Sequence, residues 1–201
     1  EINDSSRRLG RPIVLEMAYS LGIEDFSLQL ERLREANVQA IVHWGDAREG
    51  ALILNQMRRM GMEHPYFACD RCISEEFIEL AGANADGVIC TSPWDPTRTD
   101  PPYLAFRAAF RRRFGEEAET FAAHAYDGMN MLIWAIQVAG LNRARIRDVL
   151  AHRTTPWKGV TGDIVLSAAL DDVGDVYLAR REGGRWNYYS REELGIPRQD
   201  A

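Results

Sequence analysis

Short apolar runs alternate with amphipathic stretches along the first half of the chain, and this alternation constrains the fold most. Strand-like runs lie at residues 12–18, 38–44, 65–69 and 86–92, and helix-like stretches at 25–37, 48–61, 74–82 and 103–115. Strands that are joined by single helices with short connections form parallel sheets wound by helices. The pattern therefore predicts an α/β fold, a doubly wound parallel sheet with helices on both faces.

The expected helices carry their own boundary signals. Ser74 is a good N-cap for the stretch that follows it, and Glu75 and Glu76 place carboxylates in the first turn, at the positive end of the helix dipole. Gly61 and Gly115 stand where two other helices are expected to end, because glycine adopts the left-handed conformation common at C-caps. These signals support the predicted elements.

The second half of the chain has a different pattern. Residues 121–140 form a helix candidate that is apolar nearly all round, and such a helix needs partners on all sides. A sheet of about four strands covers one face of it at most. A second helix at 143–151, a strand at 163–167 and a hairpin through Gly183–Gly184 are expected to follow. The chain does not obviously supply what the long helix packs against.

Composition and charge exclude several classes of protein. The chain has 201 residues and a formal net charge of −6, which argues against a nucleic-acid partner. No run of about 18 apolar residues occurs, so no segment is expected to span a membrane. The chain begins without methionine, and we expect either that a leader was removed or that it is a piece of a longer product.

Residues at the ends of the expected strands are the candidates for a ligand site, because open α/β sheets bind ligands beyond the carboxyl ends of their strands. Those ends carry Tyr19, then Trp44, Gly45 and Asp46, then Asp70 and Arg71, then Pro93, Trp94 and Asp95. Aromatic rings beside carboxylates suit an amphipathic ligand such as a cationic amine with an apolar part. The alternative is that these are turn and cap residues.

Cys69 and Cys72 stand in C-x-x-C spacing on either side of an Asp-Arg pair. Four interpretations are open: a metal site that recruits Cys90 and His64, a thioredoxin-like redox pair, a disulfide, or two half-buried unreactive thiols. The spacing matches no common zinc pattern, and we predict neither a metal nor another cofactor.

Motifs of catalysis are mostly absent. The chain has no G-x-S-x-G elbow, G-x-G-x-x-G fingerprint, P-loop or H-E-x-x-H sequence. His43 stands close to Asp46 and could form an acid–base pair, but a strand histidine that is satisfied within a core is more common. We therefore expect a protein that is not an enzyme.

Three stretches together resemble the type I periplasmic solute-binding proteins of the leucine/isoleucine/valine-binding kind. They are DFSLQLERLREANVQAIVHWG with LILNQMRRMGM, HAYDGMNMLIWAIQVAG, and RIRDVLA with GVTGDIVL. The resemblance implies the second lobe of that two-lobed fold, with the first lobe missing. It divides the chain into a second-lobe α/β domain (1–118), a return segment that packs on the first lobe (119–172), and a C-terminal hairpin and tail (173–201).

The resemblance implies a periplasmic or membrane-tethered component of an ABC importer, which captures a small solute and passes it to the permease. A ligand-sensing ectodomain with the same fold is the alternative. It also implies a ligand site at Trp44, Asp46, Asp70 and Phe121, with the Asp70 carboxylate on the ammonium group of an amino acid. Arg71 would serve a ligand that has its own carboxylate or no amine. If the helix at 121–140 is left bare, we expect it to favour self-association.

Overall fold

The computed structural model describes residues 2–196 and divides into two compact units. Of the described residues, the first unit comprises 2–91 and Ala179–Asn187, and the second comprises Ser92–Leu178 and 188–196.

The first unit contains a parallel sheet. Strands β1 (Ile41–His43), β2 (Tyr66–Ala68) and β3 (Ile89–Ser92) lie side by side in the order β1-β2-β3. β1 and β2 pair in parallel, as do β2 and β3. The parallel sheet predicted from the sequence is confirmed.

A hairpin extends this sheet beyond β3. Strands β6 (Tyr177–Glu182) and β7 (Arg185–Ser190) follow β3 in the strand order. Gly183 and Gly184 form the turn with φ of 57° and 81°, a left-handed conformation that glycine adopts without strain. The predicted hairpin is therefore present.

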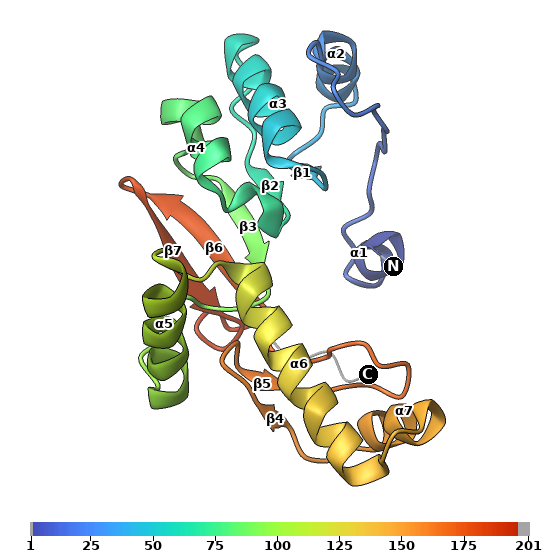
Figure 1. The fold of residues 1–201 in the computed structure, drawn as a ribbon. Helices are drawn as coiled ribbons and strands as arrows, with labels where there is room; N and C mark the ends of the chain where they lie inside the picture. Colours follow the sequence, from blue (N-terminus) through green and yellow to red (C-terminus); the bar gives the residue numbers. More distant parts are fainter. Residues whose placement is uncertain (1, 197–201) are drawn as a thin grey trace. The chain divides into compact units, whose positions relative to one another are not determined.

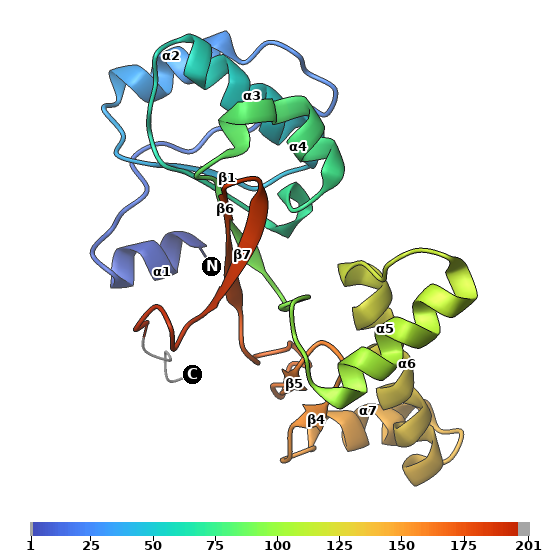
Figure 2. The same ribbon diagram turned by 90° about the vertical axis from the view of Figure 1, so that its left-hand side faces the viewer.

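The helices of the first unit are α1 (Ile2–Arg8), α2 (Ser27–Glu35), α3 (Ala47–Arg59) and α4 (Glu75–Ala81), with short 3₁₀ helices η1 (Asp70–Cys72) and η2 (Gly82–Ala85). α3 packs between α2 and α4, and all three lie on the same side of β1 (Figures 1 and 2). Val42, whose side chain points to the other face of the sheet, is 57% exposed. The described helices thus cover one face of β1, whereas the sequence pattern led us to expect both faces covered.

Alternation along the strands and a helical repeat build the core of the first unit. Ile41 points inward and is buried, as a period of two residues requires. On α3, Ala51, Leu54 and Met57 recur every three residues and are fully buried. At the start of α4 the Ser74 side chain accepts a hydrogen bond from the Phe77 N–H, which confirms the predicted N-cap.

The strand expected at residues 12–18 does not form. The segment is irregular, and Val14 is 71% exposed. A strand needs a neighbour to pair its backbone N–H and C=O groups, and β1 is the last strand in the order at this edge. The β-rich composition of this run is therefore not sufficient to make it a strand.

Up to residue 196, the second unit contains three helices and a short antiparallel pair of strands. The elements are α5 (Pro101–Phe114), α6 (Thr120–Ala139), α7 (Arg143–Ala151), β4 (Trp157–Lys158) and β5 (Asp163–Ile164). Asp100, Glu119 and Asn142 cap the three helices, each with a side-chain oxygen that accepts backbone N–H groups.

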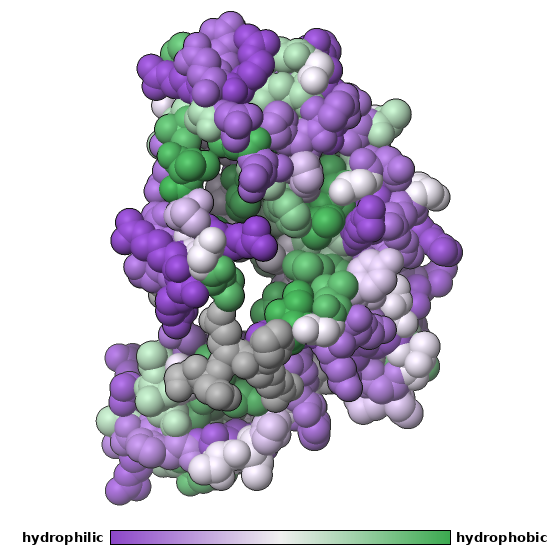
Figure 3. All heavy atoms as spheres, turned by 180° about the vertical axis from the view of Figure 1, so that it is seen from behind, coloured by the Kyte–Doolittle hydropathy of each residue, from purple (hydrophilic) through white to green (hydrophobic). Residues whose placement is uncertain are grey.

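Helix α6 buries one narrow stripe. Its buried residues recur every fourth position and are Ala123, Asp127, Met131 and Ala135. Apolar residues on its other faces stay exposed: Met129 is 56% exposed and Val138 is 59% exposed. Apolar side chains also remain elsewhere on the surface, as the green regions of Figure 3 show. Among residues 2–196 no helix combines the length and apolar character that crossing a membrane requires.

Candidate functional site

The loops that follow β1 and β2 lie at the same edge of the sheet. His43 at the end of β1 is in register with Ala68 of β2, so the residues that come next leave the sheet side by side. Four of the five candidate residues, Trp44, Asp46, Asp70 and Arg71, lie in these two loops. The two loops also meet where Cys69 Sγ lies 3.2 Å from the Gly45 carbonyl oxygen.

Asp46 and Arg71 form an ion pair between the two loops. Arg71 Nη1 lies 2.7 Å from Asp46 Oδ1, and both side chains are about half exposed. Asp46 is the N-cap residue of α3, yet its side chain makes no cap hydrogen bond. The Asp46 carboxylate raises the pKa of Arg71 above its ordinary value. The other guanidinium N–H groups of Arg71 have no partner among residues 2–196.

Asp70 lies between the two cysteines, as the first residue of η1. It is partly buried, and within residues 2–196 its carboxylate accepts no hydrogen bond. Trp44, in the neighbouring loop, is 68% exposed. The free carboxylate of Asp70 can accept hydrogen bonds from an amine of a ligand, and the free guanidinium donors of Arg71 can bind an acid. The site can therefore bind a ligand that carries an amine, an acid or both.

A buried polar group supports these loops from within. Tyr19 Oη lies 2.7 Å from His43 Nε2, and His43 Nδ1 lies 3.9 Å from Cys72 Sγ. Burial lowers the pKa of His43, so the neutral imidazole is favoured. His43 therefore serves as a satisfied core residue, and its ring nitrogens are turned to Tyr19 and Cys72.

Gly45 makes this arrangement possible. A Cβ atom at this position would stand 2.0 Å from Tyr19 Oη and 2.7 Å from His43 Nε2. Any side chain would displace the two rings. Tyr19, which was a candidate for the ligand site, is thus engaged with the core.

The three cysteines, Cys69, Cys72 and Cys90, are free thiols and buried. Within the described part of the chain no three His, Cys, Asp or Glu side chains come together as metal ligands would. The structure thus shows no disulfide among these three cysteines, and their thiols are free.

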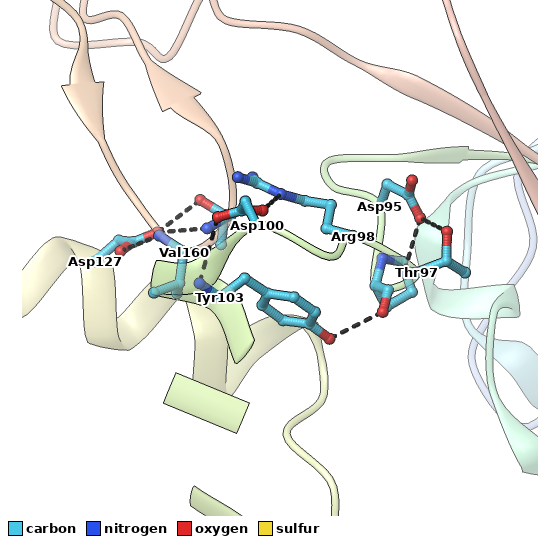
Figure 4. A network of polar contacts seen from close by, with 9 residues as sticks. Asp95, Thr97, Arg98, Asp100, Tyr103, Asp127 and Val160 are labelled. Atoms are coloured by element: carbon cyan, nitrogen blue, oxygen red, sulfur yellow. Dashed lines mark hydrogen bonds and ion pairs between the residues drawn. The ribbon is translucent and has the colours of Figure 1, made fainter. Parts of the chain in front are cut away.

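The residues after β3 belong to the second unit and have structural roles. Trp94 is 4% exposed and packs edge-on against Tyr103 and His124. Asp95 Oδ1 accepts from Thr97 N and Thr97 Oγ1 at 2.8 and 2.6 Å (Figure 4). Trp94 is therefore a core residue of the second unit, and Asp95 is a turn residue.

Phe121 lies in the first turn of α6 and is 66% exposed. It is in the second unit, whereas Trp44, Asp46, Asp70 and Arg71 are in the first. The structure thus brings four of the five candidate residues to one edge of one sheet.

Sequence reasoning missed a buried carboxylate on α6. Asp127 is 2% exposed and accepts hydrogen bonds from Val160 N, Thr161 N and Thr161 Oγ1 at 2.9, 2.8 and 2.7 Å (Figure 4). An aspartate in the middle of an apolar helix was the signal, because a buried charge requires dedicated donors. Its position in the A-Y-D stretch and that of its donors in G-V-T-G explain why these two motifs occur together.

The model of a family described as periplasmic binding protein matches residues 1–181. A leucine/isoleucine/valine-binding protein homolog of Brucella abortus (strain 2308) is 29% identical over 196 residues. That match covers 95% of this chain and 52% of the relative, so the chain spans about half the length of the curated relative.

Solved structures are similar over the same extent. A leucine-binding protein, LivK, of Thermotoga maritima has a TM-score of 0.80 and 26% identity, covering 92% of this chain and 53% of its own. The branched-chain amino acid transporter substrate-binding protein LivJ of Streptococcus pneumoniae, solved in complex with isoleucine, has a TM-score of 0.74 and 30% identity. It covers 93% of this chain and 55% of its own.

Proposed function

Because the chain belongs to the periplasmic binding protein family, we propose that it is part of the solute-binding component of an ABC importer. The family is a non-enzymatic one that binds solutes. We propose amino acids or similar small amphipathic solutes as ligands, the periplasm as its location, free or membrane-tethered, and the importer's permease as its partner. The similarity to proteins that bind leucine and isoleucine supports this assignment.

The observation that carries the proposal is the unpartnered carboxylate of Asp70. Within residues 2–196 no side chain or backbone N–H donates to it, although it stands at a strand end where such folds bind ligands. A charge-assisted hydrogen bond from a ligand ammonium is the strong contact that this carboxylate lacks. We propose that Asp70 binds the α-ammonium group of an amino acid.

The other residues complete the proposed site. Trp44 offers an exposed aromatic ring to the apolar part of the ligand. Arg71, oriented by Asp46, keeps donors for a carboxylate. Phe121, which is exposed on α6, is the residue that segment 119–172 adds to the proposed site. We propose that this segment returns to the other lobe of the full protein.

The proposed domain division also follows from this function. Residues 1–118 form the ligand-binding lobe, and residues 173–201 form the hairpin and tail. The exposed apolar faces of α6, at Met129 and Val138 for example, support the packing of segment 119–172 against additional chain.

A thermal-shift screen tests the proposal on the longest chain that the gene encodes. The panel contains L-amino acids and, for each, the matched carboxylic acid without the amine. A ligand that binds only the folded protein raises the melting temperature by mass action. We expect shifts only with amine-containing compounds. Shifts only with amine-free acids would move the binding role to Arg71, and no shift in either set would contradict the proposal.

A further inference from the structure

Cys69 and Cys72 are the first and fourth residues of a single tight turn. Cys72 N donates to Cys69 O at 3.1 Å, which closes the 3₁₀ turn of η1. Such a turn brings its first and fourth Cα atoms within about 7 Å, which overlaps the range that a disulfide spans. The backbone therefore holds Cys69 and Cys72 in positions from which their sulfur atoms can bond.

The two thiols differ in pKa. The neighbouring Cys72 thiol and the backbone N–H of Arg71 lower the pKa of Cys69 to about 6 from an ordinary 9.0. The same contact and burial raise the pKa of Cys72. Cys69 is therefore the thiol of the pair that loses its proton first.

Cys90 is the other thiol in reach of this region. It lies on β3, in register with Ala68, and is fully buried. Burial raises the pKa of Cys90, which keeps it protonated and unreactive. Cys90 is therefore a matched internal control for the chemistry of the other two.

We propose that Cys69 and Cys72 are a redox-active pair, which a peroxide converts into a disulfide within the loop that carries Asp70. The Cys69 thiolate attacks one peroxide oxygen, the O–O bond breaks, and the leaving hydroxide takes up a proton to become water. The Cys72 sulfur then attacks the sulfenic sulfur of Cys69. The S–O bond breaks, and the second hydroxide leaves as water with the Cys72 proton. Two thiols lose two electrons in total, and the peroxide takes up both.

The disulfide would span the two residues between the cysteines, Asp70 and Arg71. It would remove the S–H donor of Cys72 and restrict the loop that presents the Asp70 carboxylate. An effect on ligand affinity follows, and this second step rests on the proposed function. The oxidation itself does not depend on it.

Mass spectrometry on the purified chain tests the oxidation. The chain is exposed to a small excess of hydrogen peroxide, quenched with a thiol-alkylating reagent under denaturing conditions, and digested. We expect the intact mass to fall by about 2 Da, the peptides to show a Cys69–Cys72 disulfide, and only Cys90 to be alkylated. The variant Cys90→Ser should form the same disulfide, whereas Cys72→Ser should stop at the sulfenic acid of Cys69.

Three results would overturn the proposal: all three thiols alkylated after peroxide, a disulfide that includes Cys90, or the same loss of mass in Cys72→Ser. Ligand-induced melting shifts of the reduced and oxidised chains then test the second step. A difference between the two supports it. If neither form responds to any ligand although the disulfide forms, the proposed function fails and the redox pair stands.

Discussion

The Asp127 carboxylate is bound by Thr161, which donates its backbone N–H at 2.8 Å and its hydroxyl at 2.7 Å. The N–H of Val160 adds a third hydrogen bond at 2.9 Å. All three residues are buried, so the carboxylate exchanges water for a complete set of protein donors. These three hydrogen bonds connect the middle of α6 to the turn before β5.

We expect Asp127→Asn to destabilise the chain by about 2–4 kcal/mol. The amide keeps the shape of the carboxylate but replaces one acceptor with an NH₂ group, which faces the donors of Thr161. Urea denaturation followed by tryptophan fluorescence measures the change. Asp148→Asn is the control, because the Asp148 side chain is 58% exposed, and its free energy of unfolding should change by less than about 0.5 kcal/mol. Equal stability of the two variants would contradict the role of Asp127.

Two glycines in the second unit should respond to alanine in opposite directions. A Cβ at Gly159 would stand 2.4 Å from Asp127 Oδ2, so Gly159→Ala must displace the buried carboxylate and should cost about 1–3 kcal/mol. A Cβ at Gly128, within α6, meets no atom within 4 Å. Gly128→Ala should stabilise the chain by about 0.5–1 kcal/mol, because alanine favours the helix. Thermal denaturation of both variants checks the signs, and a shift in the same direction for both would contradict this prediction.

Local signals were sufficient to predict most of the helices. The Ser74 cap and the glycines at 61 and 115 act within a few residues, so the sequence carries all the information they need. The strand at 12–18 failed because its existence depends on a partner strand, which no local pattern can supply.

The candidate site was predictable only in part, for the same reason. The common edge of Asp46 and Arg71 follows from the parallel sheet, although the two residues are 25 positions apart. Trp94 instead packs against Tyr103 in a core, and this arrangement depends on packing within the second unit. The hydrogen bond between Asp127 and Thr161 joins residues that are 34 positions apart. Before the structure, the resemblance to a family was the only link between the A-Y-D and G-V-T-G stretches that contain these residues.

His43 should make the stability of the chain depend on pH. Burial lowers the pKa of His43 below its ordinary 6.5, so between the two values the unfolded chain binds more protons than the folded one. Stability is therefore complete above about pH 6.5 and falls as the pH drops below it. The ionisable groups that face His43 are those of Tyr19, Tyr66, Cys72, Asp46 and Glu49.

Urea denaturation at a series of pH values between about 8 and 5 measures this dependence. In His43→Gln, which cannot titrate, the decrease below pH 6.5 should be smaller than in the native sequence. Glu49 and Asp46 are present in both chains, so the difference between the two curves isolates His43. If the two curves run parallel, the imidazole does not cause the loss of stability.

Arg71→Gln should leave the melting temperature nearly unchanged and alter ligand preference. The ion pair with Asp46 is solvent-exposed on both sides, and such pairs contribute little to stability. If Arg71 binds a ligand carboxylate, the variant should bind carboxylate ligands at least about tenfold more weakly, which corresponds to one charge-assisted hydrogen bond. Calorimetric titration measures the affinity. Unchanged affinity for every carboxylate ligand would exclude Arg71 from the site.

Asp70→Asn should abolish the binding of amino acids without unfolding the chain. The Asp70 carboxylate has no partner within residues 2–196, so its replacement breaks no internal hydrogen bond and the melting temperature should stay within a few degrees. Loss of a desolvated ammonium–carboxylate pair costs about 2–5 kcal/mol of binding free energy, or roughly 30- to 4,000-fold in affinity. Glu79→Gln, which removes an exposed carboxylate on α4, controls for the change in net charge. Calorimetric titration of the full-length protein with the best ligand of the thermal-shift screen measures the affinity. Native-like affinity in Asp70→Asn would show that the Asp70 carboxylate does not bind the ligand. A loss of affinity in both variants would show that binding depends on the overall charge.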